Sequence, residues 1–226
     1  MNTRYTLIRS IRKTLAIHIT KEANVEVRAP LKMLQKDIDA FVQKKILWID
    51  RHVAEQQQRL ERKNEFSLQF GEILQLHGNE YPLLQDSKKK TRFDGKAFWA
   101  PAELSGEQLK QAIVKLYRTL AREMICMKVN VYAKQMNLPV DSVRITSAKT
   151  RWGSCSSKNR LSFSWRLVFS EESVVDYLVV HELAHIKEHN HSSAFWNIVK
   201  FYLPEYQDQK KKLKQLQEKL SKENWD

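Results

Sequence analysis

The residues best suited to chemistry in this chain form one short run, His181-Glu182-Leu183-Ala184-His185. Two histidines four positions apart point the same way on a helix, because one turn takes 3.6 residues. They can therefore hold one metal ion between them, and Glu182 can take a proton from a water molecule that this ion activates. The pattern is typical of zinc hydrolases. We predict an enzyme with one Zn²⁺ per chain, with other divalent metals left open as alternatives.

A catalytic zinc ion usually has three protein ligands, and His189 and His191 compete for the third place. His181, His185 and His189 would form one stripe on a straight helix, but spread over about 12 Å of its axis, too far for bonds near 2 Å to one ion. The chain must turn back, and Asn190 tolerates the left-handed conformation that ends helices. Ser192 or Ser193 can then cap the next helix. This favours His191 and leaves His189 as the alternative.

The residues before the motif predict the helix that must carry it. Val174, Leu178 and Val179 are spaced to give one apolar face, and Ser170 is a suitable N-cap. The segment from Glu171 to Val180 is therefore predicted to be a helix that leads directly into the motif.

Composition points to a compact enzyme in a reducing compartment. The 226 residues are 42% hydrophobic, and no apolar stretch is long enough to span a bilayer. The first residues carry arginines and no apolar run, which argues against a secretory signal. With only Cys126 and Cys155, a disulfide framework is not expected, so we predict a cytoplasmic protein without a membrane partner.

The formal net charge of +13 is spread over both halves of the chain rather than gathered in a tail. It fits a solvated surface or, alternatively, a polyanionic substrate such as a nucleotide or nucleic acid. No nucleic-acid-binding module accompanies the charge, so sequence-specific binding is not predicted. The sequence does not indicate an oligomeric state.

Several motifs together resemble the YgjP-like metallopeptidase family, which is related to the SprT-like and Wss1-like zinc proteases. They are Arg151-Trp152-Gly153-Ser154-Cys155-Ser156, Leu161-Ser162-Phe163-Ser164-Trp165-Arg166-Leu167, Val180-His181-Glu182-Leu183-Ala184-His185, Asn190-His191-Ser192 and Phe195-Trp196. The resemblance is close from about 145 to 203 and loose before that. It implies His181, His185 and His191 as metal ligands and Glu182 as catalytic base. It places Cys155 near the metal, where we expect a small buried thiol rather than a ligand.

The pattern of apolar residues predicts an α+β fold. The predicted strands are a hairpin over 15–27 closed by Pro30, then 66–70, 73–77, 97–100, 142–147 and 161–168, with Trp152-Gly153-Ser154 as the turn before the last. The predicted helices run from 38 to about 62, from Ser105 to Met136, from Ser193, and from about 204 to 220. We expect a β-rich N-terminal part with one long helix, residues 1–104. A zincin-like part, residues 105–226, would pack the HExxH helix on a small sheet.

Three functions remain open from the sequence. The favoured one is a metallopeptidase that uses metal-activated water on a polypeptide or peptide substrate, with Glu182 as general base and Arg151 as a candidate to stabilise the oxyanion. A metal-dependent hydrolase of phosphoanhydrides, such as a nucleotide pyrophosphatase, could use the same metal-activated water. A non-catalytic metal-binding interaction module is the third, although it would need no base beside the metal. By analogy with other zincins, the strand over 161–168 could pair with an extended peptide.

Overall fold

The computed structural model describes residues 5–65, 67–87, 90–221 and 223–225. The chain divides into two compact units, one comprising Met1–Phe66 with Lys222–Asn224 and the other Ser67–Ser221 with Trp225–Asp226. The boundary predicted between residues 104 and 105 therefore lies inside the second unit. The predicted mixture of helices and small sheets, an α+β fold, is confirmed.

The first unit contains a three-stranded sheet of β1 (Thr6–Ser10), β2 (Ala16–Ile19) and β3 (Val25–Pro30) in the order β1-β3-β2. The antiparallel pair β2–β3 confirms the predicted hairpin, and β3 ends at Pro30 as expected. Strand β1, which the sequence analysis missed, pairs in parallel with β3. Alternate residues of β3 point to the core of the unit.

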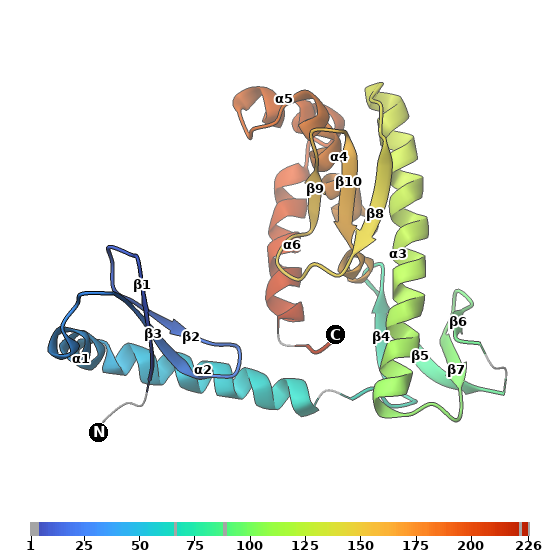
Figure 1. Cartoon of the computed structure of the whole chain (residues 1–226). Helices are drawn as coiled ribbons and strands as arrows, with labels where there is room; N and C mark the ends of the chain where they lie inside the picture. Colours follow the sequence, from blue (N-terminus) through green and yellow to red (C-terminus); the bar gives the residue numbers. More distant parts are fainter. Residues whose placement is uncertain (1–4, 66, 88–89, 222, 226) are drawn as a thin grey trace. The chain divides into compact units, whose positions relative to one another are not determined.

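Helices α1 (Gln35–Lys44) and α2 (Ile46–Glu65) replace the single helix predicted from 38 to about 62. Lys45 leaves the helical conformation, with φ −105° and ψ 9°. The break changes the direction of the chain while Ile38, Val42 and Ile49 all stay in one core with the sheet. The prediction that this segment is helical is thus confirmed. The break was not predicted, because no glycine or proline lies near Lys45 to indicate it. Figure 1 shows both helices along one side of the sheet.

The second unit begins with a four-stranded sheet in the order β4-β5-β7-β6. Its strands are β4 (Ile73–Leu76), β5 (Asn79–Asp86), β6 (Arg92–Phe93) and β7 (Phe98–Pro101). The strands predicted at 73–77 and 97–100 are confirmed within one residue at each end, whereas β5 and β6 were missed. The strand predicted at 66–70 is wrong for residues 67–70, which do not form a strand, and Phe66 lies outside the described residues.

Helix α3 (Gly106–Met136) connects the two sheets of this unit and confirms the long helix predicted from 105 to 136. Figure 1 shows β4–β7 beside its first turns and β8–β10 beside its later turns. Tyr117 lies in the middle of the core, where its hydroxyl donates to the carbonyl of Gln75 at 2.8 Å. Its ring contacts the rings of Phe98, Trp165 and Phe169. This aromatic cluster anchors α3 to the segment that leads to the motif helix.

The second sheet of this unit places β10 (Arg160–Ser164) between β8 (Ser142–Thr146), which is parallel to it, and β9 (Gly153–Cys155), which is antiparallel. The predicted strand at 142–147 is confirmed. The prediction for 161–168 is wrong beyond Ser164, because Trp165–Phe169 form a buried 3₁₀ helix. The predicted turn at Trp152-Gly153-Ser154 is also wrong in part, since β9 begins at Gly153.

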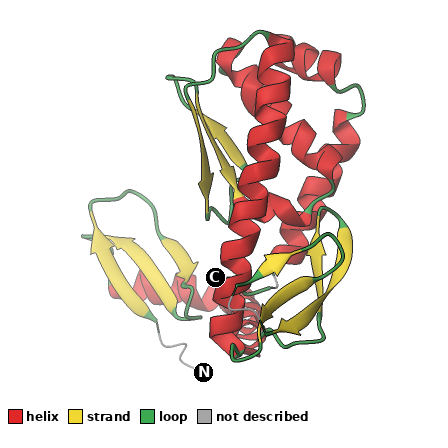
Figure 2. Cartoon of the chain, turned by 90° about the vertical axis from the view of Figure 1, so that its right-hand side faces the viewer, coloured by secondary structure: helices red, strands yellow, loops and turns green. Residues whose placement is uncertain are grey.

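Three helices complete the unit: α4 (Glu172–Lys187), α5 (Ser193–Tyr202) and α6 (Tyr206–Leu220). Both C-terminal helices were predicted, α6 beginning two residues later than expected. Figure 2 shows these helices gathered with α3 at one side of the β8–β10 sheet. Within the described part of the chain, no helix has the length and apolar character needed to cross a membrane.

Candidate metal centre

Helix α4 carries three of the predicted site residues on a largely buried element. Its core-facing side chains include Val175, Val179 and Leu183, which are fully buried. The predicted N-cap is wrong: Glu171 occupies the cap position, and the Ser170 hydroxyl donates instead to the Leu167 carbonyl at 2.7 Å. Serine is therefore used to close the preceding 3₁₀ helix. The packing of α4 against α3 and β9 fixes its orientation, which confirms the expected HExxH helix on a small sheet.

The chain turns back after α4 and brings His191 toward the two helical histidines. Helix α4 ends at Lys187, and Glu188 is extended. Asn190 does not adopt the predicted left-handed conformation, because it is absent from the residues with positive φ; its side chain accepts a hydrogen bond from the Ser192 amide at 3.1 Å. Ser192, one of the two predicted caps, accepts from the Phe195 amide at 3.3 Å and begins α5.

The imidazole rings of His181, His185 and His191 converge. Each offers one ring nitrogen, and these nitrogens all lie within 4.8 Å of one another. The two Nε2 atoms of His181 and His191 are 3.1 Å apart. Within the described residues, this is the one group of three or more histidine, cysteine or carboxylate side chains close enough to share an ion. His189 is not part of it, so the geometry separates the two candidates that the sequence left open.

The donor set fits a zinc ion on two further grounds. Tetrahedral bonds of about 2.0–2.1 Å put neighbouring ligand nitrogens roughly 3.3 Å apart, close to the spacing of the two Nε2 atoms. Nδ1 of His185 lies 3.0 Å from the Glu188 carbonyl. Because a carbonyl can only accept, Nδ1 must carry the proton, which leaves the lone pair of Nε2 free for a metal. Burial and the neighbouring His185, His191 and Lys210 lower the pKa of His181 to about 3, and burial lowers that of His185. Both rings are thus neutral, as ligation requires.

Glu182 lies beside this cluster on the inner side of α4 and is only 5% exposed. Burial raises the pKa of its carboxyl group to about 7, an effect that the charge of Arg151 partly opposes. A carboxylate in such surroundings holds and releases a proton near neutral pH, which suits a general base. No ordinary ion-pairing role accounts for its position, because none of the described ion pairs includes it.

The three histidines and Glu182 line a cavity of about 290 Å³ whose other wall is β9. Gly153, Ser154 and Cys155 contribute this wall, and His189 also lines the cavity. Cys155 is half-buried with a free thiol and does not belong to the ligand group. Burial and the nearby Glu182 raise the pKa of that thiol, so it stays protonated and weakly nucleophilic. In the sequence, Gly153 indicated only a turn, and its place opposite Glu182 was not predicted.

A model of the YgjP-like metallopeptidase domain matches residues 13–216 of the chain. The chain belongs to the YgjP-like family. The resemblance read from the motifs is confirmed over nine-tenths of the sequence, and with it a metallopeptidase as the coarse function, a metal requirement and peptides as the class of substrate. This YgjP-like domain extends over both units, beginning before the β2–β3 hairpin and ending in α6.

One solved structure with similarity to this YgjP-like chain is described as the metallopeptidase zymogen of Pyrococcus abyssi abylysin. The two sequences are 23% identical, the match covers 39% of this chain and 90% of that chain, and the TM-score is 0.37. No curated protein matches the chain significantly.

The remaining candidates of the YgjP-like site occupy different surroundings. Arg151 is exposed and precedes β9; it does not line the cavity, although its charge reaches Glu182. Trp165 is a core residue, 1% exposed. Trp196 does not line the cavity, but its ring stacks on that of His191 with centroids 5.7 Å apart.

Proposed function

We propose that this protein is a zinc-dependent peptidase in which His181, His185 and His191 hold the ion and Glu182 is the general base. One observation carries the proposal: three converging imidazoles and a buried carboxylate share one cavity with an edge strand. Family membership supports the reaction class, and the donor geometry supports the residue roles. Nitrogen donors from three histidines favour zinc over magnesium or calcium, which prefer oxygen.

Contacts within the protein fix the orientation of two of the histidine rings in the absence of a substrate. The hydrogen bond from Nδ1 of His185 to the Glu188 carbonyl holds that ring in one tautomer and one orientation. His191 is held by the turn that Ser192 caps and by stacking on Trp196. When bound, zinc would supply a Lewis acid that polarises the scissile carbonyl and acidifies a water molecule.

Glu182 would accept the proton of the attacking water on its carboxylate and donate it to the departing amine nitrogen. Its burial keeps bulk water from competing for that proton, and the absence of a side chain at Gly153 gives the carboxyl group room beside β9. Arg151 is our candidate for stabilising the oxyanion, because it lies two residues before β9 and its positive charge acts on Glu182.

The strand that could receive a peptide differs from the one first considered. β10 is the central strand, with both edges already paired, so it cannot take an added strand. β9 lies at the edge of its sheet and contributes Gly153, Ser154 and Cys155 to the cavity. We therefore propose β9 as the partner of an extended substrate. The cytoplasm remains our proposed location, because both cysteines are free thiols, which suits a reducing compartment.

The test compares wild type with Glu182→Gln for zinc content, casein cleavage and release of phosphate or pyrophosphate from nucleotides. We expect about one zinc in each protein and casein cleavage by wild type alone. Nucleotide hydrolysis without proteolysis would assign the site to phosphoanhydrides. Equal activity in both proteins would remove Glu182 as the base, and zinc binding without turnover in either assay would indicate a non-catalytic module.

A further inference from the structure

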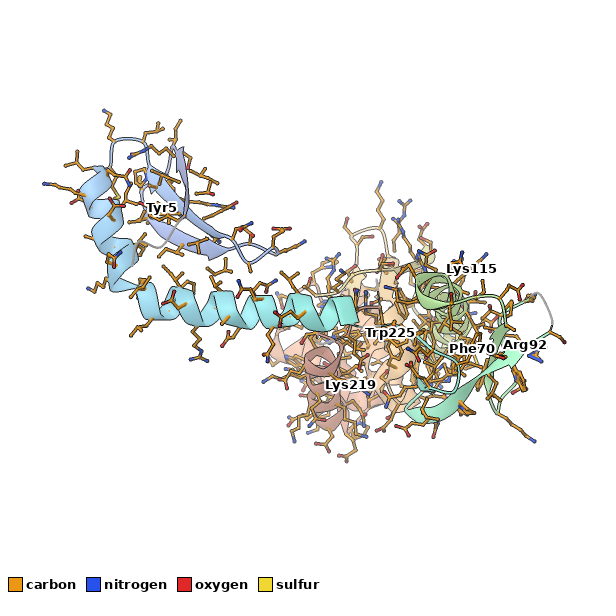
Figure 3. All side chains as sticks on the ribbon, turned by 90° about the horizontal axis from the view of Figure 1, so that it is seen from below. Tyr5, Phe70, Arg92, Lys115, Lys219 and Trp225 are labelled. Atoms are coloured by element: carbon orange, nitrogen blue, oxygen red, sulfur yellow. The ribbon has the colours of Figure 1, made fainter. Side chains whose placement is uncertain are left out.

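A second cavity lies next to the metal centre, between the first turn of α5 and the first three turns of α6. Its volume is about 720 Å³. We call it the lysine groove, and its lining residues are Trp196, Tyr206, Gln207, Lys210, Lys211 and Lys214. Apart from the tryptophan, all of them come from α6, whose last turn carries Lys219 (Figure 3). The groove is outside the cavity that holds Glu182, since the two share no lining residue.

Trp196 connects the groove to the proposed ligands. Its ring centroid is 5.7 Å from that of His191 and 5.8 Å from that of His181. On the groove side, Nζ of Lys210 lies 5.0 Å from the centroid of the same ring. A substrate bound at the metal centre would therefore have its neighbouring residues within reach of the lysine side chains.

Two ammonium groups in the groove are available for a ligand. Lys211 is paired with Asp208 at 3.0 Å. Neither Lys210 nor Lys214 forms an ion pair with any residue in the described part of the chain. Both side chains are exposed, so their ammonium groups are accessible to a ligand. A cluster of cations without carboxylate partners favours an anionic ligand.

The aromatic residues of the groove do not offer free faces for a planar ring. Trp196 stacks on His191 and also on Tyr206, the latter with centroids 5.2 Å apart and rings inclined by 19°. Tyr206 stacks in turn on Tyr177. Recognition of a nucleobase depends on stacking against such faces. The chemistry left to the groove is that of point charges, which suits a carboxylate on a flexible side chain.

We infer that the lysine groove binds an aspartate or glutamate side chain of the polypeptide substrate, a few residues from the scissile bond. This inference rests on the proposed peptidase function and adds a substrate class to it. Lys210 and Lys214 supply the charge, and the aromatic wall fixes the position of the groove relative to the metal centre. The groove thus makes the enzyme selective for acidic segments.

The experiment measures binding separately from turnover. A fluorescein-labelled decapeptide of alternating glutamate and alanine, and its glutamine–alanine counterpart, are titrated into the Glu182→Gln protein by fluorescence anisotropy. The same titrations follow in that background with Lys210→Gln and Lys214→Gln together, and with Lys115→Gln as the matched control. Lys115 is an exposed lysine of α3 that does not line the groove (Figure 3).

We expect the acidic peptide to bind about tenfold more tightly than the neutral one, because two exposed ion pairs together can supply the roughly 1.4 kcal/mol to which this ratio corresponds. The double lysine variant should lose this preference, and Lys115→Gln should keep it. Equal affinity for both peptides, or a preference that survives in the double variant, would overturn the inference. Tight binding of ATP through the two lysines, without binding of the acidic peptide, would overturn it in favour of a phosphate ligand.

Cleavage of the two peptides by wild type then separates this inference from the proposed function. Preferential binding and preferential cleavage of the acidic peptide support both. Preferential binding with no cleavage of either peptide or of casein supports the groove and contradicts the peptidase. Cleavage of both peptides at equal rates contradicts the groove and leaves the peptidase standing.

Discussion

Gly153 of β9 faces the side chain of Glu182 on α4 so closely that position 153 has no room for a methyl group. A Cβ atom built on Gly153 would lie 2.7 Å from Cγ and 2.8 Å from Cδ of Glu182, and closer still to Oε1. Separations under 3.0 Å force one of the groups to move. The glycine is not required by its own backbone conformation, since it is not among the residues with positive φ. Its role is to leave space for the carboxyl group.

Replacement of Gly153 by alanine should therefore displace Glu182 and reduce peptidase activity while the protein stays folded. We expect kcat/KM to fall about 10- to 100-fold, in line with the cost of misplacing a catalytic group by about 1 Å. Zinc content should remain near wild type, because the three atoms nearest to the added methyl group all belong to Glu182. Activity, zinc content and the melting temperature together test this expectation.

A double variant tests whether Gly153→Ala acts through its contact with Glu182. If the methyl group acts through Glu182, then Gly153→Ala should change little in a protein that already carries Glu182→Gln, so the two effects should not add. Additive losses would show that Gly153→Ala acts on another part of the site.

Single replacements of His191 and His189 by alanine should show which of the two residues is the third zinc ligand. His191 belongs to the converging group and His189 does not. Loss of even an outer partner of a metal ligand costs about 10- to 100-fold in affinity, so loss of a ligand should cost more. We expect His191→Ala to lose zinc on dialysis and His189→Ala to retain it, measured by elemental analysis. The reverse result would place the third ligand at His189.

The sequence predicted the long helices and the metal motif because their signals are local. The spacing of His181 and His185 fixes their common face on any helix. The run from Ser105 to Met136 has one apolar face and stops before Pro139. The turn to His191 was also predictable in outline, since the separation of His181 from His189 along a straight helix is incompatible with one ion.

The failures arise where tertiary contacts decide the local structure. β5 was missed because Pro82 and a run of apolar residues hide its alternation, although His77 and Gly78, both with positive φ, form the two-residue turn that pairs it with β4. The short strand β9 has almost no strand propensity at Gly153-Ser154-Cys155; it exists because it pairs with β10. Its contact with Glu182 joins segments almost thirty residues apart, and no local pattern reveals it.

Ser192 caps the helix that follows His191, so its removal should loosen that end of the site. Its Oγ accepts from the Phe195 amide at 3.3 Å. We expect Ser192→Ala to lower the free energy of unfolding by about 1 kcal/mol and to weaken zinc binding, because the turn that positions His191 becomes mobile. Ser193→Ala is the matched control, since Ser193 is exposed and begins the helix without capping it. Chemical denaturation and zinc titration give both quantities, and equal effects from the two variants would contradict the capping role.

Lys128 connects α3 to α4 and should stabilise the folded state up to alkaline pH. Its ammonium group is buried and lies 2.9 Å from Asp176 and 3.1 Å from Glu172. Burial alone would lower the pKa of Lys128, but the two carboxylates outweigh it and raise the pKa above its ordinary 10.5. A raised lysine pKa means that the charged form stabilises the folded state below about pH 10, and that this contribution disappears as pH rises through the raised value. Lys128→Met should therefore lower the free energy of unfolding by about 2 kcal/mol at neutral pH. This difference in stability from wild type should shrink only above a pH of about 10.5. Lys110→Met removes a buried lysine whose one ion pair among the described residues is with the exposed Glu107, and it should cost less. Urea denaturation across this pH range measures both differences, and a gap for Lys128→Met that closes near neutral pH would contradict the assignment.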